Sequence, residues 1–433
     1  MDLHGWGRYP RQQAQLAFPL SASQCSTAIA HGAPLIARGL GRSYGDSALA
    51  AHVMGTRYLD HFVAFDAELG LLTCEAGVSL DAILRAFVPR NWFLPVIPGT
   101  RFVTVGGAIA SDVHGKNHHV AGTFAAHVKS LELLLGNGER VTASPYENAE
   151  LFHATCGGMG LTGIILSATL QLKPILASSI LQTTVKAPNL ETVLEAFAAN
   201  AASTYSVAWI DCLAKGKSLG RSLLVLGEHA LDGPLAVQTK TPTPVPFDLP
   251  AALLNRASVQ AFNSLYYGRV WQKVSHQRIA FESFFFPLDA IGQWNRLYGK
   301  PGFVQYQFVL PQAAGVVGLR EVLSRIAESG RGTFLAVLKV FGQANANYLS
   351  FPQAGYTLAL DFKAEPAVFA LLDALDAIVL HHGGRLYLAK DARMSANTFK
   401  ASYPNWTAFE AVRERWHAHG KFASAQSRRL GLL

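Results

Sequence analysis

Cysteine is scarce in this chain of 433 residues. The four cysteines, Cys25, Cys74, Cys156 and Cys212, lie far apart, and no two of them form a Cys-x-x-Cys pair. Such spacing is typical of thiols that pack singly in a protein interior. We therefore expect four buried, free cysteines.

Long apolar runs are also missing, although hydrophobic residues make up 50% of the chain. No segment reaches the ~18 consecutive apolar residues that a membrane-spanning helix needs. The first residues, Met1 to Trp6, lack the basic and apolar stretches of a signal peptide. We expect a cytoplasmic protein, either free or in peripheral contact with the inner face of the plasma membrane. The alternative is that a partner protein carries it across this membrane.

Basic residues are in moderate excess over acidic residues, and they are not clustered along the sequence. The chain has 37 Lys and Arg against 29 Asp and Glu, a formal net charge of +8, and its densest basic run is only Arg428-Arg429. Nucleic-acid binding would require clustered basic residues with aromatic residues among them. The scattered excess better fits attraction to phosphate-bearing substrates and anionic membrane surfaces.

Glycine, in contrast, is concentrated in three turns near the N-terminus, at residues 38–46, 98–107 and 114–119. Hydroxyl groups and cations lie among the glycines. Glycine lets the backbone adopt positive φ and approach a ligand closely, and successive free N–H groups in such turns form anion sites. We interpret the three turns as a cradle for a large, diphosphate-bearing cofactor.

A Rossmann-type dinucleotide site does not fit these turns. Gly39 and Gly41 are followed by a glycine at position 45, one residue too late for the G-x-G-x-x-G spacing. Residues 158–163 match the spacing, but a predicted helix at 150–155 precedes them and a predicted strand at 164–172 follows. The fingerprint needs the opposite order, with the pyrophosphate at the N-terminus of the following helix. We therefore reject it.

The motifs resemble those of flavoproteins in the vanillyl-alcohol oxidase / p-cresol methylhydroxylase superfamily, and most of all members that oxidise a polyprenyl-phosphate sugar. The resemblance is highly specific at the FAD site and less so for the sugar-lipid substrate. The matching stretches are Arg38 to Ser47, Leu94 to Gly122, Glu150 to Thr169, Gly292 to Pro311, Gly383 to Arg393 and Phe422 to Leu433.

The resemblance implies which residues contact FAD. They are Arg38, Gly39, Leu40, Gly41, Arg42, Ser43, Tyr44, Gly45, Gly99, Thr104, Val105, Gly106, Gly107, His114, Gly115, Lys116, Asn117, Ile165 and Tyr387. Many members carry a histidine at the end of the first turn that bonds covalently to the flavin, and Arg42 stands in its place here. Guanidinium cannot form that bond but can pair with phosphate, so we expect non-covalent FAD.

Lys390 and His114 are the candidate catalytic residues. Lys390 follows apolar residues 386–389, and partial desolvation would favour its neutral form, which could accept a hydroxyl proton. Alternatively, it orients the substrate as a cation or extends to solvent. The resemblance places His114 against the flavin near the substrate hydroxyl. A structural histidine is the main alternative, and no carboxylate or cysteine completes a zinc spacing around it, so we expect no metal.

Tyr44, Gln307, Lys339 and Lys390 are the candidate substrate residues. Lys339 lies within an apolar strand, where an unpaired charge is costly, so we expect either a structural ion pair or contact with substrate phosphate or ribose. Gln305 and Gln307 share one face of a strand at 303–309, and Gln307 is the better candidate for sugar hydrogen bonds. Ala359 stands where some relatives carry a cysteine in the substrate site, so thiol-directed inhibitors should not attach here.

The resemblance implies an α+β fold of two domains with the vanillyl-alcohol oxidase-like arrangement. We expect an FAD-binding domain at residues 1–175, completed by 381–433, and a substrate domain at 176–380 with an antiparallel sheet and flanking helices. Residues 231–275 include Pro-rich chain and then apolar, aromatic and basic residues. This segment is either a mobile lid that touches the bilayer or ordinary packing under a loop.

The implied reaction is FAD-dependent oxidation of the ribose 2′-hydroxyl of a polyprenyl-phosphoryl-β-D-ribose to a 2′-keto intermediate. A separate NAD(P)H-dependent short-chain reductase would complete epimerisation to the arabinose lipid used in cell-envelope synthesis. The alternatives are an oxidase of small polyols or aldonolactones on the same scaffold and a flavin-binding scaffold without catalysis. The apolar settings of Lys339 and Lys390 argue against the last.

Overall fold

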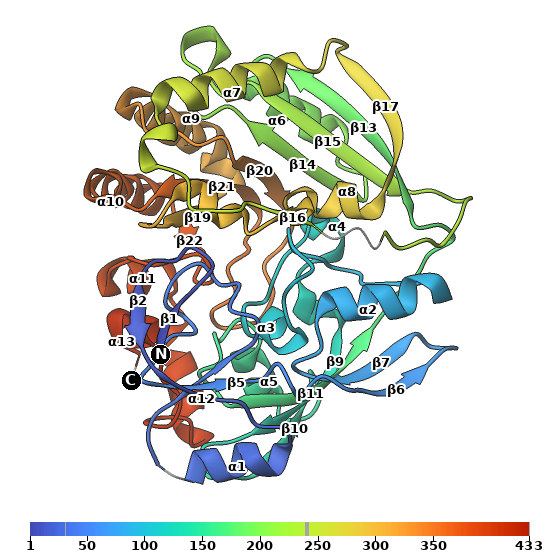
Figure 1. Cartoon of the computed structure of the whole chain (residues 1–433), viewed down its shortest axis with the longest axis vertical. Helices are drawn as coiled ribbons and strands as arrows, with labels where there is room; N and C mark the ends of the chain where they lie inside the picture. The colour runs from blue at the N-terminus through green and yellow to red at the C-terminus, as the bar shows by residue number, and fades with distance from the viewer. Residues whose placement is uncertain (31, 239–241, 433) are drawn as a thin grey trace.

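The protein is described by a computed structural model that covers residues 1–30, 32–238 and 242–432. Its architecture is α+β with two domains: a large antiparallel sheet fills the upper half in Figure 1, and smaller sheets fill the lower half. Buried side chains form one core that extends from beneath the large sheet into the lower half, and a second core that lies mainly in the lower half and reaches residues 281–286. All four cysteines are buried and free, as expected.

The lower half is built on a five-stranded antiparallel sheet and a three-stranded parallel sheet. Two of its strands, β9 and β10, are consecutive in the chain and pair antiparallel as a hairpin. The five-stranded sheet has the order β10 (Arg140–Ala143), β9 (Val128–Leu134), β11 (Ile164–Gln171), β7 (Leu71–Glu75) and β6 (Phe62–Asp66). The parallel sheet has the order β3 (Gln15–Ala17), β5 (His52–Gly55) and β4 (Ile36–Arg38).

Short helices connect and cover these strands. Ser79 Oγ accepts a hydrogen bond from Ala82 N and caps one of them, which buries its apolar face as its 3.6-residue spacing predicts. The helices of this half are α1 (Ala22–Ala30), α2 (Leu80–Phe87), α3 (Val105–Ala110), α4 (His118–Ala121) and α5 (Ala149–Thr155). The helix–turn–strand order around residues 158–163 is confirmed, with α5 before and β11 after.

The upper half is an eight-stranded sheet in which every neighbouring pair is antiparallel. The expected antiparallel sheet with flanking helices is confirmed, because α6 (Leu190–Ala199), α9 (Gln312–Ser329) and α10 (Pro366–His381) pack on its strands (Figure 1). The strand order is β17 (Val274–Ala280), β13 (Ser179–Ala187), β15 (Ser222–His229), β14 (Tyr205–Ile210), β20 (Ala336–Phe341), β21 (Gly355–Lys363), β19 (Phe303–Pro311) and β22 (Arg385–Leu386).

Alternation along the strands separates two faces of this sheet. Leu338, Leu358 and Phe308 belong to the core shared with the helices. Their strand neighbours, including Lys339, Ala359 and Gln307, turn to the opposite face. The register therefore collects the polar residues of three strands on the side that faces the lower half.

The C-terminal stretch returns to the lower half. Leu35 N donates to Lys421 O, and Ala423 N donates to Leu35 O, which makes a short parallel bridge between the two ends of the chain. The returning helices are α11 (Ala396–Ser402), α12 (Trp406–Arg415), which packs on α5, and α13 (Ala425–Leu430). The chain termini lie close together in Figure 1.

Residues 231–275 follow β15 and lead into β17. Residues 239–241 of this segment lie outside the described part of the chain. The proline-rich stretch does form one ladder: β16 (Thr243–Pro244) pairs in parallel with β18 (Ile291–Gly292), and Val245 N supplies the hydrogen bond that Pro244 cannot. Helix α7 (Arg256–Gly268) follows.

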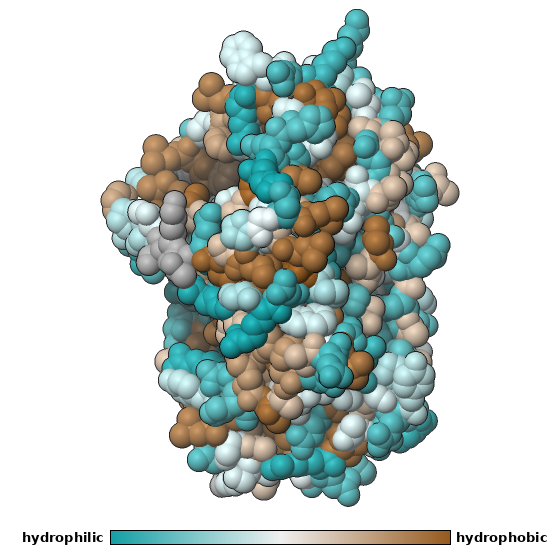
Figure 2. All heavy atoms as spheres, turned by 90° about the vertical axis from the view of Figure 1, so that its right-hand side faces the viewer, coloured by the Kyte–Doolittle hydropathy of each residue, from teal (hydrophilic) through white to brown (hydrophobic). Residues whose placement is uncertain are grey.

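None of the helices in the described part of the chain combines the length and the apolar character that a membrane crossing requires. Exposed apolar side chains occur instead as smaller groups. Figure 2 shows the face that carries β17 and the β6–β7 hairpin, and such side chains gather across its middle, where the two halves meet.

Candidate active site

A cavity of about 670 Å³ separates the glycine turns below from the polar face of the eight-stranded sheet above. Most of the residues predicted for the cofactor and substrate lie on its wall. They are Gly39, Leu40, Gly41, Arg42, Ser43, Tyr44, Gly99, Thr104, Gly106, Gly107, His114, Gly115, Lys116, Ile165, Gln307, Lys339, Tyr387 and Lys390. Residues that are up to about 350 positions apart in the sequence thus line the same cavity.

Four predicted cofactor residues, Arg38, Gly45, Val105 and Asn117, do not line this cavity. The Arg38 guanidinium donates to the carbonyl oxygens of His4 and Ala48, and the Asn117 amide donates to Pro95 O. Val105 is fully buried in the lower core. These side chains are used within the protein and shape the turns, and contact of these four residues with FAD stays a prediction.

Gly45 has a specific reason to be glycine. A Cβ at this position would lie 1.9 Å from Asp391 O, so only glycine lets the first turn pack against the turn that carries Lys390. Tyr44 N donates to Ala389 O at 3.1 Å across the same contact. The first glycine turn and Lys390 are therefore held together by backbone.

The wall has the shape that a flat, phosphate-bearing cofactor requires. A Cβ on Gly99 would meet no heavy atom within 4 Å, so this glycine leaves open space at the cavity rather than room for a protein neighbour. Thr104 Oγ1 accepts from Gly107 N, which orders the second turn at the cavity wall. The residues present fit FAD.

Arg42 lies at the cavity wall between aromatic rings. Its guanidinium carbon is 4.0 Å from the Trp6 ring centroid and 5.4 Å from that of Phe102. Burial lowers the pKa of Arg42, and the Asp289 carboxylate opposes that shift. Stacking fixes the plane of the guanidinium and leaves its N–H groups for an acceptor such as a phosphate oxygen.

His114 is held between two predicted substrate residues. Lys339 Nζ lies 3.0 Å from His114 Nδ1, and Gln307 Nε2 lies 3.1 Å from His114 Nε2. Gln307 Nε2 also donates to Thr357 Oγ1, whose own hydroxyl donates to Phe308 O. Both ring nitrogens of the imidazole therefore have a polar partner, which fixes the plane of the ring.

The surroundings of this imidazole hold it neutral, and they also act on Lys339. Burial, and then the charge of Lys339, lower the pKa of His114 well below its usual value, so the ring is neutral. Burial also lowers the pKa of Lys339 to about 7, with further lowering from Lys116 and Lys390. Among the described residues, no carboxylate lies within ion-pair distance of Lys339, so the alternative of a structural ion pair is wrong.

Lys116 is a third lysine at the cavity, and like Lys339 and Lys390 it is half-buried. Its ammonium donates to Phe284 O and lies 4.4 Å from the Phe284 ring centroid. Burial lowers its pKa to about 7. In the described chain, no carboxylate pairs with Lys116 or Lys390 either. Three lysines without anionic partners make this cavity suited to an anionic ligand.

Lys390 faces the first turn. Its Nζ lies 3.9 Å from the Tyr44 ring centroid. Burial lowers the pKa of Lys390, while the charge of Asp361 opposes the shift. The predicted desolvation of Lys390 is thus present, and the alternative in which it extends to bulk solvent is wrong.

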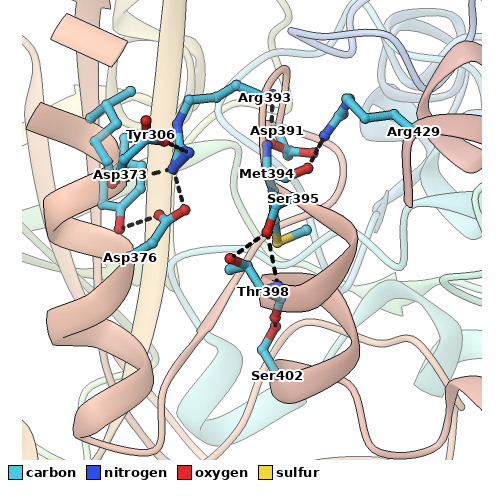
Figure 3. Close-up of polar contacts among 11 residues, drawn as sticks. Tyr306, Asp373, Asp376, Asp391, Arg393, Met394, Ser395, Thr398, Ser402 and Arg429 are labelled. Atoms are coloured by element: carbon cyan, nitrogen blue, oxygen red, sulfur yellow. Dashed lines mark hydrogen bonds and ion pairs between the residues drawn. The ribbon is translucent and has the colours of Figure 1, made fainter. Parts of the chain in front are cut away.

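A network of paired charges holds the turn that carries Lys390 (Figure 3). Asp391 Oδ1 accepts from Arg393 N and Met394 N, and its Oδ2 pairs with Arg429 Nη2 at 2.8 Å. Arg429 also pairs with Asp46, directly after the first glycine turn. On the other side, Arg393 pairs with Asp373 and Asp376 of α10. We call these residues, Asp46, Asp373, Asp376, Asp391, Arg393 and Arg429, the anchor.

Several residues at the site escaped the sequence analysis. Trp209 and Trp294 line the cavity, and Asp361 lies behind Gln305, which the sequence had placed on the same strand face as Gln307. For Asp361 a signal existed, because a carboxylate ends the apolar run at residues 356–360. The tryptophans gave no signal that separates a cavity wall from a core. No group of three or more metal-ligating side chains occurs among the described residues.

Comparison with known proteins gives the site a context. A family model described as an FAD binding domain matches residues 15–144, which contain the three glycine turns. Over its whole length the chain is 39% identical to decaprenylphosphoryl-beta-D-ribose oxidase of Mycolicibacterium smegmatis, of which it covers 97%. An uncharacterised protein of Streptomyces coelicolor is 33% identical over 82% of this chain and 100% of its own length. A segment covering 25% of the chain is 28% identical to human Delta(24)-sterol reductase.

Proposed function

The chain belongs to the family of decaprenylphosphoryl-β-D-ribose oxidase, and from this membership we propose that it oxidises the ribose 2′-hydroxyl of a polyprenyl-phosphoryl-β-D-ribose to the 2′-ketone. The chain is an FAD-dependent oxidoreductase. The observation that carries the proposal is the direct backbone contact between the first glycine turn and the Lys390 turn, both on one cavity wall. A cofactor cradle and a desolvated amine are thereby fixed side by side.

The cavity offers matching groups for the two polar parts of such a substrate. Lys116 and Lys339, half-buried and without carboxylate partners in the described chain, suit the phosphoryl group. Gln305 and Gln307 present amides from neighbouring positions of β19 and suit ribose hydroxyls. A free alditol would use the glutamines but would leave the lysines without an anion.

Lys390 is the proposed base. FAD, when bound, supplies a two-electron acceptor for the hydride from the ribose carbon. The lone pair of neutral Lys390 Nζ takes the proton of the 2′-hydroxyl, so that one proton and one hydride leave the substrate and the C–O bond becomes a carbonyl. Tyr44 then stabilises the ammonium through its ring face. Neutral His114, with its ring fixed by Lys339 and Gln307, orients the sugar.

We further propose the vanillyl-alcohol oxidase-like arrangement for this fold, with residues 1–175 and 381–433 as the FAD-binding domain and 176–380 as the substrate domain. The return of the C-terminal stretch to Leu35 supports this division. A separate NAD(P)H-dependent reductase is the proposed partner, because the 2′-ketone must be reduced to give the arabinose lipid. The helix–turn–strand at residues 158–163 cannot present a helix N-terminus to a nicotinamide dinucleotide.

The segment around α7 is the proposed entrance for the prenyl chain and the site of peripheral membrane contact. Tyr266 and Arg269 line the cavity, while Leu265 and Trp271 next to them are 76% and 91% exposed. Exposed apolar residues beside a basic residue suit an anionic bilayer surface. Replacing Leu265 and Trp271 with serine should weaken binding to phosphatidylglycerol vesicles, whereas Val317→Ser on α9 should not. Equal binding would contradict the proposal.

The decisive experiment is anaerobic mixing of the purified flavoprotein with a short-chain prenylphosphoryl-β-D-ribose. Bleaching of the yellow flavin absorbance is expected with this lipid and not with free alditols or aldonolactones. Bleaching by alditols alone would instead favour the small-polyol oxidase, and no bleaching by any of them would favour a non-catalytic scaffold.

The expected absence of a covalent bond at Arg42 is checked by denaturation in acid, which should release all of the FAD.

A further inference from the structure

Asp361 is a buried carboxylate that the proposed chemistry has not yet used. It lies on β21 two residues after Ala359, so strand alternation puts both side chains on the face that looks toward the cavity. Ala359 lines the cavity, and Asp361 is 1% exposed, deeper in the same wall. Its cross-strand partner is Gln305.

The contacts of Asp361 are incomplete. Gln305 Nε2 donates to its Oδ1 at 2.5 Å. Its Oδ2 is buried and has no hydrogen-bond partner among the described residues, and no cation there lies within ion-pair distance. An uncompensated buried carboxylate oxygen costs free energy. The anchor carboxylates Asp376 and Asp391, which are also buried, are fully paired.

The groups that face Asp361 come from four elements. Gln305 belongs to β19, Lys390 to the turn after β22, Tyr44 to the first glycine turn, and Tyr298 to the short 3-10 helix at Trp294–Tyr298. Burial raises the pKa of Tyr44 and of Tyr298, and the charge of Asp361 raises both further. Both phenols therefore stay neutral, and Lys390 is the one cation among these facing groups.

We propose that Asp361 is a positioning residue for Lys390: its carboxylate compensates the ammonium that forms on Lys390 when the substrate hydroxyl loses its proton. The inference rests on the proposed function. The proton moves from the hydroxyl oxygen to Lys390 Nζ and stays there, and the hydride leaves the carbon for FAD. Asp361 gains and loses no bond. Its negative charge stabilises the ammonium in a site of low dielectric, as the carboxylate of a catalytic triad stabilises an imidazolium.

The direction of the charge interaction agrees with this role. Burial lowers the pKa of Lys390, and Asp361 is the one group that raises it. Burial raises the pKa of Asp361 above its usual value, and the Gln305 hydrogen bond and the charge of Lys390 offset only part of this rise. Removing the carboxylate should therefore leave Lys390 with a lower pKa and with less driving force for accepting a proton.

The test uses the FAD-loaded enzyme with Asp361→Asn, which keeps the size of the side chain and an acceptor for Gln305. We expect the acid limb of the pH profile for flavin reduction to move down by about 1 pH unit or more, since a nearby opposite charge shifts a pKa by about 1–3 units. The maximal rate should fall by about tenfold or more, in the range for a positioned proton acceptor. An unchanged midpoint would overturn the inference.

A second readout does not depend on turnover. Competitive labelling of Lys390 with acetic anhydride across a pH series, followed by mass spectrometry, measures its titration midpoint directly. This midpoint should also fall in Asp361→Asn and should fall less in Gln305→Met, which keeps the charge but removes its hydrogen bond. If Asp361→Asn does not fold, the Gln305→Met variant is the deciding test. An unchanged Lys390 midpoint in that variant would overturn the inference.

Asp376→Asn is the matched control, because it removes a buried carboxylate from the anchor. It should lower stability and leave the Lys390 midpoint in place. Failure of the two proposals can be told apart. If the wild-type flavin is not bleached by the ribosyl lipid but the labelling midpoint moves, the proposed substrate is wrong. If bleaching occurs and the midpoint does not move, the inference about Asp361 is wrong.

Discussion

Two groups of buried charges flank one short turn, residues 387–394, and they are arranged in opposite ways. On one side is the anchor, in which Asp391 pairs with Arg429 and Arg393 pairs with Asp376. On the other side are the cavity groups Lys390 and Asp361, which make no ion pair within the described chain. Paired charges fix the backbone, whereas charges without an ionic partner are left to respond to a ligand. The comparison suggests that the anchor provides rigidity and that the cavity provides chemistry.

The largest expected effect is the loss of turnover in Lys390→Ala. Removing the proton acceptor should lower the rate of flavin reduction by about 10²–10⁴-fold, while FAD binding and stability stay near wild type. Anaerobic stopped-flow absorbance measures the rate. Lys400→Ala, an exposed lysine on α11, is the control. If both variants are reduced at the wild-type rate, Lys390 is not the base.

On the anchor side, Arg429→Met should mainly destabilise the fold. It would leave Asp46 and Asp391, whose side chains are 5% and 3% exposed, buried without their cation. The expected loss is about 3 kcal/mol or more in the free energy of unfolding, measured by urea denaturation. Arg428→Met, one residue earlier and exposed, should change it by less than about 0.5 kcal/mol. Equal stability of the two variants would contradict the role of the anchor.

A smaller effect should appear as a pH dependence on the cavity side. Because only the neutral amine can accept a proton, the rate of flavin reduction should rise with pH as Lys390 loses its proton, by up to about tenfold per unit on the acid side. Burial moves this rise down from the usual range of lysine. Stopped-flow reduction between about pH 6 and 9 should show it, and a rate that falls over this range would assign activity to the ammonium form.

The smallest expected effect comes from Ala359→Cys, which adds a single sulfur to the cavity wall. The four native cysteines are buried, and burial raises the pKa of Cys74 to about 12 and of Cys25 to about 11, so they should resist thiol reagents. The variant should accept one equivalent of a small thiol reagent under native conditions, as counted by intact mass. Labelling of the wild type would show that a native thiol is accessible.

Local patterns predicted the elements well where periodicity and caps agreed. Ser79 and Asn189 both cap their helices through the side chain, and the spacing of Leu319, Val322 and Ile326 matches the buried face of α9. The proline-rich stretch was less predictable, because Pro244 can still accept in a ladder when its neighbour Val245 donates. The strand propensity of proline reflects its missing N–H donor. It does not show that a neighbouring residue can donate to the ladder in its place.

Many individual residues of the candidate site could be identified from the sequence, but the contacts between them could not. The glycine turns, Lys339 and Lys390 stand out because glycine clusters and charges in apolar strands are costly unless they are used. Asp361 did not stand out, because its importance depends on the register that pairs it with Gln305 and on a turn that brings Lys390 near. The contacts of Arg38 could not be predicted, because a guanidinium in a glycine turn can equally well donate to a phosphate or to backbone carbonyls, as it does here.

The sequence by itself determined which groups this protein can use: glycines that let a ligand approach the backbone, and lysines in apolar surroundings. It did so because backbone freedom and the cost of burying charge are properties of short segments. Only the tertiary structure decided which charges are neutralised and which are left for a ligand. Ion pairs join residues such as Asp46 and Arg429 across 383 positions of sequence, and no local pattern encodes that separation.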